Sequence, residues 1–193
     1  MEIAPDVVQT LERHPAVARV EPVGSRAEGR ATAYSDYDFI VETTDFAAVA
    51  EALPALLVHL EPLAQQWDRL SHEMCWMIMI PGPTKIDFIF PNQANEQEPP
   101  WVVSCDTLPG IDAHFWDWAL WLRSKDVKGD VRLVESELRR LHEHLLGPLG
   151  VETAPSSVAD AVATYRHHRE AAERRFGCSV SRALEGAVAP VLG

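Results

Sequence analysis

The chain has 193 residues, of which 47% are hydrophobic and 24% are charged, values typical of a globular protein with one large domain or two small ones. No apolar run reaches the ~20 residues that a transmembrane helix requires, and the first residues lack the basic start and apolar core of a signal peptide. The formal net charge of −12 argues against a polymeric nucleic acid as substrate and favours a small or cationic one, because nucleic-acid-binding proteins usually present basic residues to the phosphates.

The first half of the sequence predicts alternating helices and strands. A helix is expected over residues 5–14, and an apolar strand over residues 18–23. A second strand is expected over residues 37–41. An alanine- and leucine-rich helix should follow over residues 45–60, kinked or divided at Pro54.

Two further strands are expected over residues 75–80 and 85–90. The turn between them, residues 81–84, is short, so the two strands should be antiparallel neighbours. The polar stretch over residues 91–100 contains several prolines and is interpreted as a linker.

Beyond about Ile111 the apolar residues recur with helical spacing. Helices are indicated over residues 114–122, 131–145 and 158–176. We therefore predict an α+β fold, with strands and flanking helices in residues 1–100 and a helical domain in residues 101–193.

The first of these helices is rich in tryptophan. Trp116, Trp118 and Trp121 are interpreted as packing residues rather than as a platform for a nucleobase. Trp118 lies off the face that the other two share, so it is the one expected to be exposed.

The cysteines of the sequence are widely spaced. Cys75, Cys105 and Cys178 form no CxxC metal-binding pair and no paired framework. We therefore expect reduced thiols, which are typical of a cytoplasmic protein.

The turn after the first strand has the features of a phosphate site. Gly24 and Ser25 offer backbone amides and a hydroxyl, and Arg26 adds a cation that can pair with a phosphate. A solvated surface position is an equally good interpretation of Arg26.

Three aspartates are candidates for a metal site. Asp36 and Asp38 stand two residues apart at the start of a strand, so their side chains should share one face. Carboxylates so close repel each other unless a cation lies between them, and hard oxygen ligands suit Mg²⁺. Asp87 interrupts an otherwise apolar strand, a costly place for a charge that is neither paired nor bound to a metal. If the two strands are neighbours, all three carboxylates converge.

Lys85 lies two residues before Asp87 and therefore on the same face of the strand. Two interpretations are open: Lys85 contacts a phosphate, or it is a lysine on an edge strand.

This set of residues resembles the signature of the nucleotidyltransferase superfamily. Gly24, Ser25, Asp36, Asp38 and Asp87 follow its order, GS…DxD…D. The segment GSRAEGRATAYSDYDF is similar to the version found in small bacterial members, which include the aminoglycoside and lincosamide nucleotidyltransferases and minimal antitoxin-type enzymes. The similarity covers residues 20–41 and 85–90.

The resemblance implies a nucleotidyltransferase-type mixed sheet and a two-metal mechanism. Asp36 and Asp38 would bind two Mg²⁺ ions, and Asp87 would help to bind one of them or accept the proton of the attacking hydroxyl. Ser25, together with the amides of Gly24 and Ser25, would hold the phosphates of ATP or another nucleoside triphosphate.

The helical half is similar to the C-terminal domains of antibiotic nucleotidyltransferases over a short stretch, Phe115-Trp116 followed by Lys125. In those enzymes the second domain closes over the nucleotide and contacts the acceptor. The resemblance thus implies that Lys125 reaches the triphosphate if the two domains face each other.

For the reaction, the resemblance implies transfer of AMP from ATP to a hydroxyl of a small molecule, such as an aminoglycoside- or lincosamide-like antibiotic. Two alternatives stay open: an antitoxin-type enzyme that modifies a protein partner, and a nucleotide-binding regulator without turnover. The helical half exceeds what minimal antitoxin-type members contain, and the intact carboxylate set disfavours the regulator. The acceptor, the preferred base and the assembly, a homodimer included, are left open.

Overall fold

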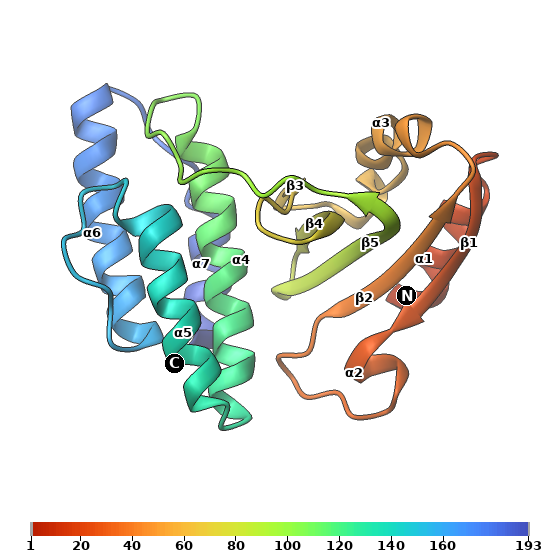
Figure 1. The fold of residues 1–193 in the computed structure, drawn as a ribbon, viewed down its shortest axis with the longest axis horizontal. Coiled ribbons are helices and arrows are strands. Elements are labelled where there is room, and N and C mark those ends of the chain that lie inside the picture. Colours follow the sequence, from red (N-terminus) through yellow and green to blue (C-terminus); the bar gives the residue numbers. More distant parts are fainter. Residues whose placement is uncertain (1, 193) are drawn as a thin grey trace. The chain divides into compact units, whose positions relative to one another are not determined.

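The computed structural model describes residues 2–192, which divide into two compact units between Glu98 and Pro99 (Figure 1). The first unit consists of α1 (Ile3–Glu12), β1 (Val17–Val23), α2 (Gly24–Ala27), β2 (Tyr37–Thr43), α3 (Phe46–Leu56), η1 (Val58–Leu60), β3 (Ala64–Trp67), β4 (Glu73–Ile80) and β5 (Thr84–Ala94). It is an α+β unit, as the sequence predicts.

The five strands form one mixed sheet in the order β1-β2-β5-β4-β3. β2 and β5 are parallel, whereas the remaining neighbours are antiparallel. The pairing of β4 with β5 confirms the antiparallel pair expected from their short turn. In this register Asp38 lies opposite Val23 of β1 and beside Asp87 of β5. The pairing thus places the C-terminal end of β1 beside the N-terminal parts of β2 and β5.

One face of the sheet packs against α1 and α3 and forms the core of this unit. Side chains alternate between the two faces along a strand, so Phe39 and Phe88 point into the core while Asp38 and Asp87 belong to the opposite face. The two phenylalanine rings stack with centroids 5.6 Å apart. The core is completed by apolar residues of both helices, of the turn after α3 and of four strands: Val7, Leu11, Val20, Val41, Val49, Leu53, Leu57, Leu60, Trp76, Ile78, Ile80, Ile86 and Phe90.

The helix α3 begins with a cap, since Asp45 accepts a hydrogen bond from the Ala48 amide at 3.1 Å. It continues through Pro54 and ends at Leu56, followed by the short 3-10 turn η1. The sequence predicted a kink or a division at Pro54; the helix is not divided there, because Pro54 lies inside α3 and the break comes after Leu56.

Three features of this unit differ from the sequence-based expectation. β5 continues to Ala94, so the prediction that a linker begins at residue 91 is wrong by at least four residues. The short strand β3 and the four-residue helix α2 were not predicted. β3 reads Ala-Gln-Gln-Trp, which has neither the length nor the β-branched residues by which a strand is recognised.

The second unit consists of α4 (Leu108–Val127), α5 (Val131–Leu141), the π-helical turn η2 (His142–Leu146), α6 (Val158–Phe176) and α7 (Ala183–Leu192). α4 packs against α5, α6 and α7 and is therefore the central helix. Trp118 is only 7% exposed, so the prediction that it is the exposed tryptophan of α4 is wrong. Its indole nitrogen donates to Glu137 of α5 at 3.2 Å.

A buried polar network joins three helices of this unit. Asp112 of α4 accepts hydrogen bonds from the Tyr165 hydroxyl at 2.7 Å and from Arg169 at 3.1 Å. Arg169 also pairs with Glu185 of α7 at 2.5 Å. Burial raises the pKa of Asp112, while its hydrogen bonds from Tyr165 and Arg169 oppose that rise. A buried charge with this many partners fixes how α4, α6 and α7 pack.

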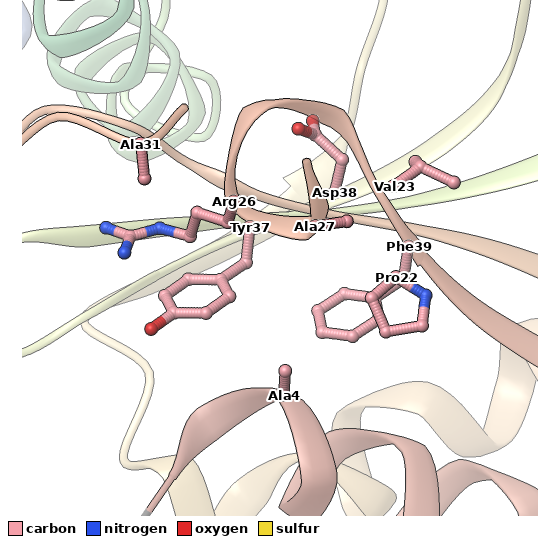
Figure 2. A pocket seen from close by; sticks show the side chains of 9 residues that line it. All are labelled: Ala4, Pro22, Val23, Arg26, Ala27, Ala31, Tyr37, Asp38 and Phe39. Carbon is pink, nitrogen blue, oxygen red and sulfur yellow. The ribbon is translucent and has the colours of Figure 1, made fainter. Parts of the chain in front are cut away.

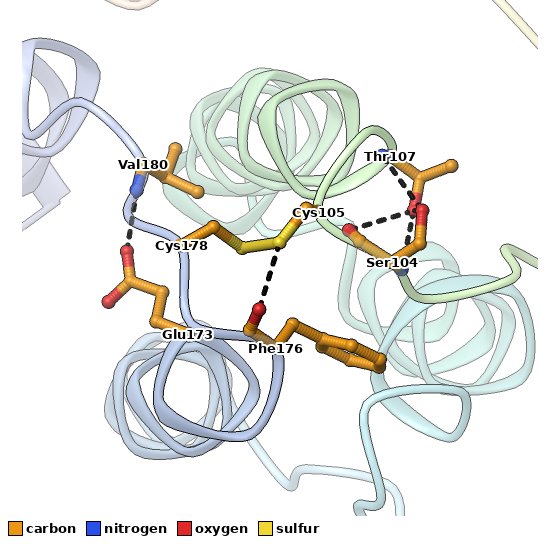
Figure 3. The surroundings of a disulfide bond; sticks show 7 residues. All are labelled: Ser104, Cys105, Thr107, Glu173, Phe176, Cys178 and Val180. Carbon is orange, nitrogen blue, oxygen red and sulfur yellow. Dashed lines mark hydrogen bonds between the residues drawn. A yellow bond between two sulfur atoms is a disulfide. The ribbon is translucent and has the colours of Figure 1, made fainter.

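A disulfide joins Cys105, which precedes α4, to Cys178, which follows α6 (Figure 3). The expectation of reduced thiols is therefore wrong for these two residues, because a separation of 73 residues gave no sign that they meet. Cys75 is a buried thiol. The disulfide removes the argument by which reduced cysteines indicated a cytoplasmic protein.

Among the helices of residues 2–192, none is both long enough and apolar enough to cross a membrane.

Candidate active site

The site is built around a close approach between Gly24 and Asp38. β1 ends at Val23, whose register partner is Asp38. The chain turns at the next residue, Gly24, which therefore lies against the Asp38 side chain. Gly24 has φ +73, a conformation that residues with a side chain rarely adopt. A Cβ on Gly24 would collide with the Oδ2 atom of Asp38. Only glycine fits at this position.

The loop between α2 and β2 is fixed at its last turn. The Arg26 side chain donates from Nε to the Ser35 carbonyl oxygen at 2.9 Å. The Ser35 hydroxyl is buried and accepts from the Thr32 amide, also at 2.9 Å. Asp36 follows Ser35 directly, so these bonds hold the backbone from which its carboxylate projects.

The three predicted aspartates come together. Asp38 and Asp87 are register partners on the parallel strands β2 and β5, and Asp36 immediately precedes β2. Each residue offers a carboxylate oxygen that lies within 4.8 Å of those of the other two. The convergence expected from neighbouring strands is thus present, and it depends on the parallel pairing of β2 with β5.

Lys85 pairs with one of these carboxylates. Its Nζ atom donates to the Oδ2 atom of Asp87 at 2.8 Å, and both residues are nearly buried, at 8% and 9% exposure. Burial raises the pKa of Asp87, and Lys85 opposes that rise. β5 is a central strand, so the interpretation of Lys85 as an edge-strand lysine is wrong. The sequence correctly placed Lys85 on the same face of the strand as Asp87, but it did not indicate the ion pair between them.

The residues fit a divalent metal ion. Three carboxylates within one cluster are hard oxygen ligands of the kind that Mg²⁺ prefers. The Oδ1 atom of Asp87 is buried and has no hydrogen-bond partner among residues 2–192, an expensive arrangement that a cation would relieve.

A small pocket lies on the other side of β2. It has a volume of about 280 Å³ and is lined by residues of α1, β1, α2 and β2. In Figure 2 the rings of Tyr37 and Phe39 lie on the side of Ala4, while the Asp38 carboxylate points the opposite way. The Arg26 guanidinium stacks on Tyr37, 4.1 Å from the ring centroid. This stacking and the bond to Ser35 give Arg26 a structural role that the sequence did not show.

The remaining predicted phosphate ligand, Lys125, belongs to α4 of the helical unit. Its Nζ atom lies 4.9 Å from the centroid of the Trp121 ring. Contact of Gly24, Ser25, Arg26, Lys85 or Lys125 with a nucleotide remains a prediction.

Residues 5–73 match the model of the nucleotidyltransferase domain family, a stretch that includes Gly24, Ser25, Asp36 and Asp38 and ends before Asp87. The chain is also similar to solved structures of a cytoplasmic RNA terminal U-transferase (19% identity, TM-score 0.37) and of the Cid1 poly(U) polymerase (18% identity, TM-score 0.35). Each of these similarities covers 46% of this chain, but only 27% and 28% of the two enzymes, so the chain spans little more than a quarter of their length.

A third similar structure is an aminoglycoside 6-adenyltransferase from Bacillus subtilis, at 10% identity and a TM-score of 0.40, over 97% of this chain and 95% of that chain. TM-scores this low say nothing about the substrate. No curated protein matches the chain significantly. The family match and the cluster of Asp36, Asp38 and Asp87 agree with each other, and the N-terminal unit therefore carries a nucleotidyltransferase domain.

Proposed function

We propose that this chain transfers a nucleoside monophosphate, AMP from ATP, to a hydroxyl of a small molecule in a reaction that requires Mg²⁺. The observation that carries the proposal is the convergence of Asp36, Asp38 and Asp87 beside the Gly24 turn. Nucleotidyl transfer needs a place where a triphosphate and a divalent cation are held together, and this part of the sheet offers both kinds of ligand.

Each residue has a part in the proposal. Asp36, Asp38 and Asp87 hold Mg²⁺, which would supply charge stabilisation at the α-phosphate and at the leaving pyrophosphate. The amides of Gly24 and Ser25 and the Ser25 hydroxyl bind phosphate oxygens. The Oδ1 atom of Asp87 has no hydrogen-bond partner within the described part of the chain, so it is the oxygen left to ligate a metal or to take the proton of the acceptor hydroxyl.

The acceptor in the proposal is a small molecule, and the charge of the chain supports a cationic one. A net charge of −12 attracts cations and repels the phosphates of a nucleic acid. An aminoglycoside, which carries several amino groups, is the kind of acceptor that this balance favours, and its modification would confer antibiotic resistance.

The test is to incubate the protein and MgCl₂ with each labelled nucleoside triphosphate and a panel of acceptors: aminoglycosides, lincosamides and a cell extract containing proteins. Pyrophosphate release and product mass are measured. We expect release from ATP with an aminoglycoside or lincosamide, and a product heavier by one adenylate.

The control is Asp38→Asn, which keeps the size of the side chain and removes its charge. We expect it to lower pyrophosphate release by ~10³-fold or more, because charged groups at the reacting centre supply much of the rate enhancement.

A labelled protein in the extract would point to a protein acceptor instead. Binding of ATP-Mg²⁺ without pyrophosphate release from any acceptor would contradict the enzymatic proposal.

A further inference from the structure

Lys85, for which the sequence left open a phosphate contact or an edge-strand position, occupies a different and unusual place in the structure. Of the lysines in the chain, Lys128 is exposed, whereas Lys85 is buried on the central strand β5. A buried ammonium group is costly unless an anion compensates it, and Lys85 meets that requirement through Asp87. Lys85 and Asp87 therefore form a buried ion pair inside the site and not a solvent-exposed pair at its rim.

The two oxygens of Asp87 have different surroundings. Oδ2 accepts the hydrogen bond from Lys85 at 2.8 Å. Oδ1 is buried and has no hydrogen-bond partner among residues 2–192. Asp87 thus presents one oxygen that is already satisfied by a cation and one that is available to a further ligand.

The register of the sheet places Lys85 near the other carboxylates as well. Tyr37 is the partner of Ile86 on the parallel strands β2 and β5, and Asp36 and Lys85 each precede that pair by one residue. Lys85 therefore stands beside a cluster that carries three negative charges when all its carboxylates are ionised. At these separations the repulsion within such a cluster is substantial.

From this geometry we propose that Lys85 is a positioning residue, a built-in counter-cation that holds the three carboxylates together before a metal arrives. It fixes Asp87 through Oδ2, so that Asp87 meets a metal through Oδ1 alone. It also offsets one of the negative charges, which lowers the affinity of the nucleotide-free site for a divalent cation. The metal then binds best together with a nucleotide. The part of this proposal that concerns the metal rests on the proposed function, whereas the charge compensation does not.

The experiment compares Lys85→Met with the wild type in the full-length protein, by thermal unfolding in EDTA and in MnCl₂. The variant keeps the aliphatic stem and removes the cation, which leaves Asp87 buried without its partner. We expect its Tm to fall by ~5–10 °C in EDTA, because breaking a buried ion pair is strongly destabilising. MnCl₂ should restore most of this loss, while the wild type should respond much less.

Direct titration with Mn²⁺ in the absence of nucleotide is the second readout. Lys85→Met should bind Mn²⁺ ~10-fold more tightly than the wild type, since one positive charge beside the site is gone. Lys128→Met is the matched control: it removes the same charge from an exposed position in the helical unit and should change neither Tm nor Mn²⁺ affinity.

Two further variants keep the proposal falsifiable if Lys85→Met folds poorly. Lys85→Arg retains the cation and should retain most of the stability in EDTA. The double variant Lys85→Met, Asp87→Asn removes both charges and should be more stable in EDTA than Lys85→Met alone. If the double variant is no more stable than the single one, Asp87 is not what Lys85 compensates, and the proposal fails.

Other outcomes separate this proposal from the proposed function. If Lys85→Met leaves Tm and Mn²⁺ affinity unchanged and only weakens ATP binding, Lys85 is a phosphate ligand and the counter-cation role is wrong. If the wild type releases no pyrophosphate but the Lys85 variants behave as expected, the counter-cation role stands and the transferase function fails. Neither the Tm nor the Mn²⁺ measurement requires a nucleotide or an acceptor.

Discussion

At the scale of single residues, Gly24 is the position that tolerates least change. Its backbone lies in the left-handed region, and any side chain would meet the Oδ2 atom of Asp38. We expect Gly24→Ala to lose about 1 kcal/mol of stability from the backbone conformation. It should also lower activity by ~10²-fold or more, because Asp38 must move to make room.

Gly29 provides the control for that variant. It has nearly the same conformation, φ +69, but a Cβ there would meet nothing within 4 Å. Gly29→Ala should therefore lose a similar amount of stability and keep its activity. Thermal unfolding and pyrophosphate release measured on both variants separate the two effects. Equal activity loss in both would show that backbone strain, and not displacement of Asp38, is responsible.

Sequence patterns identify the three aspartates of the site, but they do not identify the lysine that pairs with Asp87. Asp36 and Asp38 follow from a two-residue spacing at the start of a strand, and Asp87 stands out because it interrupts an apolar one. The ion pair of Lys85 with Asp87 could not be predicted, because it depends on the burial of β5 between β2 and β4. Burial of a strand depends on the strand order, which is a property of the whole sheet.

At the scale of elements, the unpredicted feature with the largest effect is the parallel pairing of β2 with β5. These strands are separated in the chain by α3, η1, β3 and β4, so no local signal indicates that they meet. The pattern did indicate the neighbours joined by a short turn, β4 and β5. α7 was missed as well, since Gly186 and Pro190 within ten residues do not suggest a helix.

The connection between α6 and α7 gives a prediction about acid stability. Glu173 accepts hydrogen bonds from Arg182 at 2.8 and 2.6 Å and from the Val180 amide at 2.7 Å. The bonds from Arg182 contribute most to lowering its pKa from 4.5 to about 2. A carboxyl group with a lowered pKa in the folded state stabilises the protein above its ordinary pKa, and this contribution is lost as the pH falls toward 2.

We therefore expect Glu173→Gln to be less stable than the wild type at pH 7, by about 1 kcal/mol, since Arg182 is 44% exposed and water screens the pair. The difference should shrink below pH 4.5 and vanish near pH 2. Urea unfolding of both proteins between pH 7 and pH 3 measures it. Glu170→Gln on the same helix, which pairs only loosely with Arg174, should show no such pH dependence. A difference that stays constant across the pH range would contradict the assignment.

At the scale of the whole molecule, both cysteines of the disulfide lie in the helical unit, whereas the N-terminal unit contains only the buried thiol Cys75. Reduction should therefore destabilise one unit and spare the other. The disulfide closes a loop across 73 residues, and closing a long loop limits the freedom of the unfolded chain.

We expect dithiothreitol to lower the stability of the helical unit by ~2–4 kcal/mol. The variant Cys105→Ser, Cys178→Ser should show the same loss without reductant and no further loss with it. Tryptophan fluorescence during urea unfolding reports on the helical unit, through its buried Trp116 and Trp118, when Trp67 and Trp76 of the N-terminal unit are both replaced by phenylalanine in the proteins compared. An unchanged midpoint after reduction would show that packing, and not the cross-link, stabilises this unit.

The disulfide also determines how the chain can be extended by force. With Cys105 and Cys178 joined, the chain between them forms a covalent ring that a pull on the two termini cannot open. About 73 residues at ~3.4 Å each, or roughly 250 Å of contour length, stay hidden until the bond is reduced. The ring contains α4, α5, η2 and α6 entirely, while α7 lies outside it. In an oxidised molecule a pulling force or an unfoldase can therefore extend α7 fully. The disulfide keeps α4, α5 and α6 covalently linked within the ring.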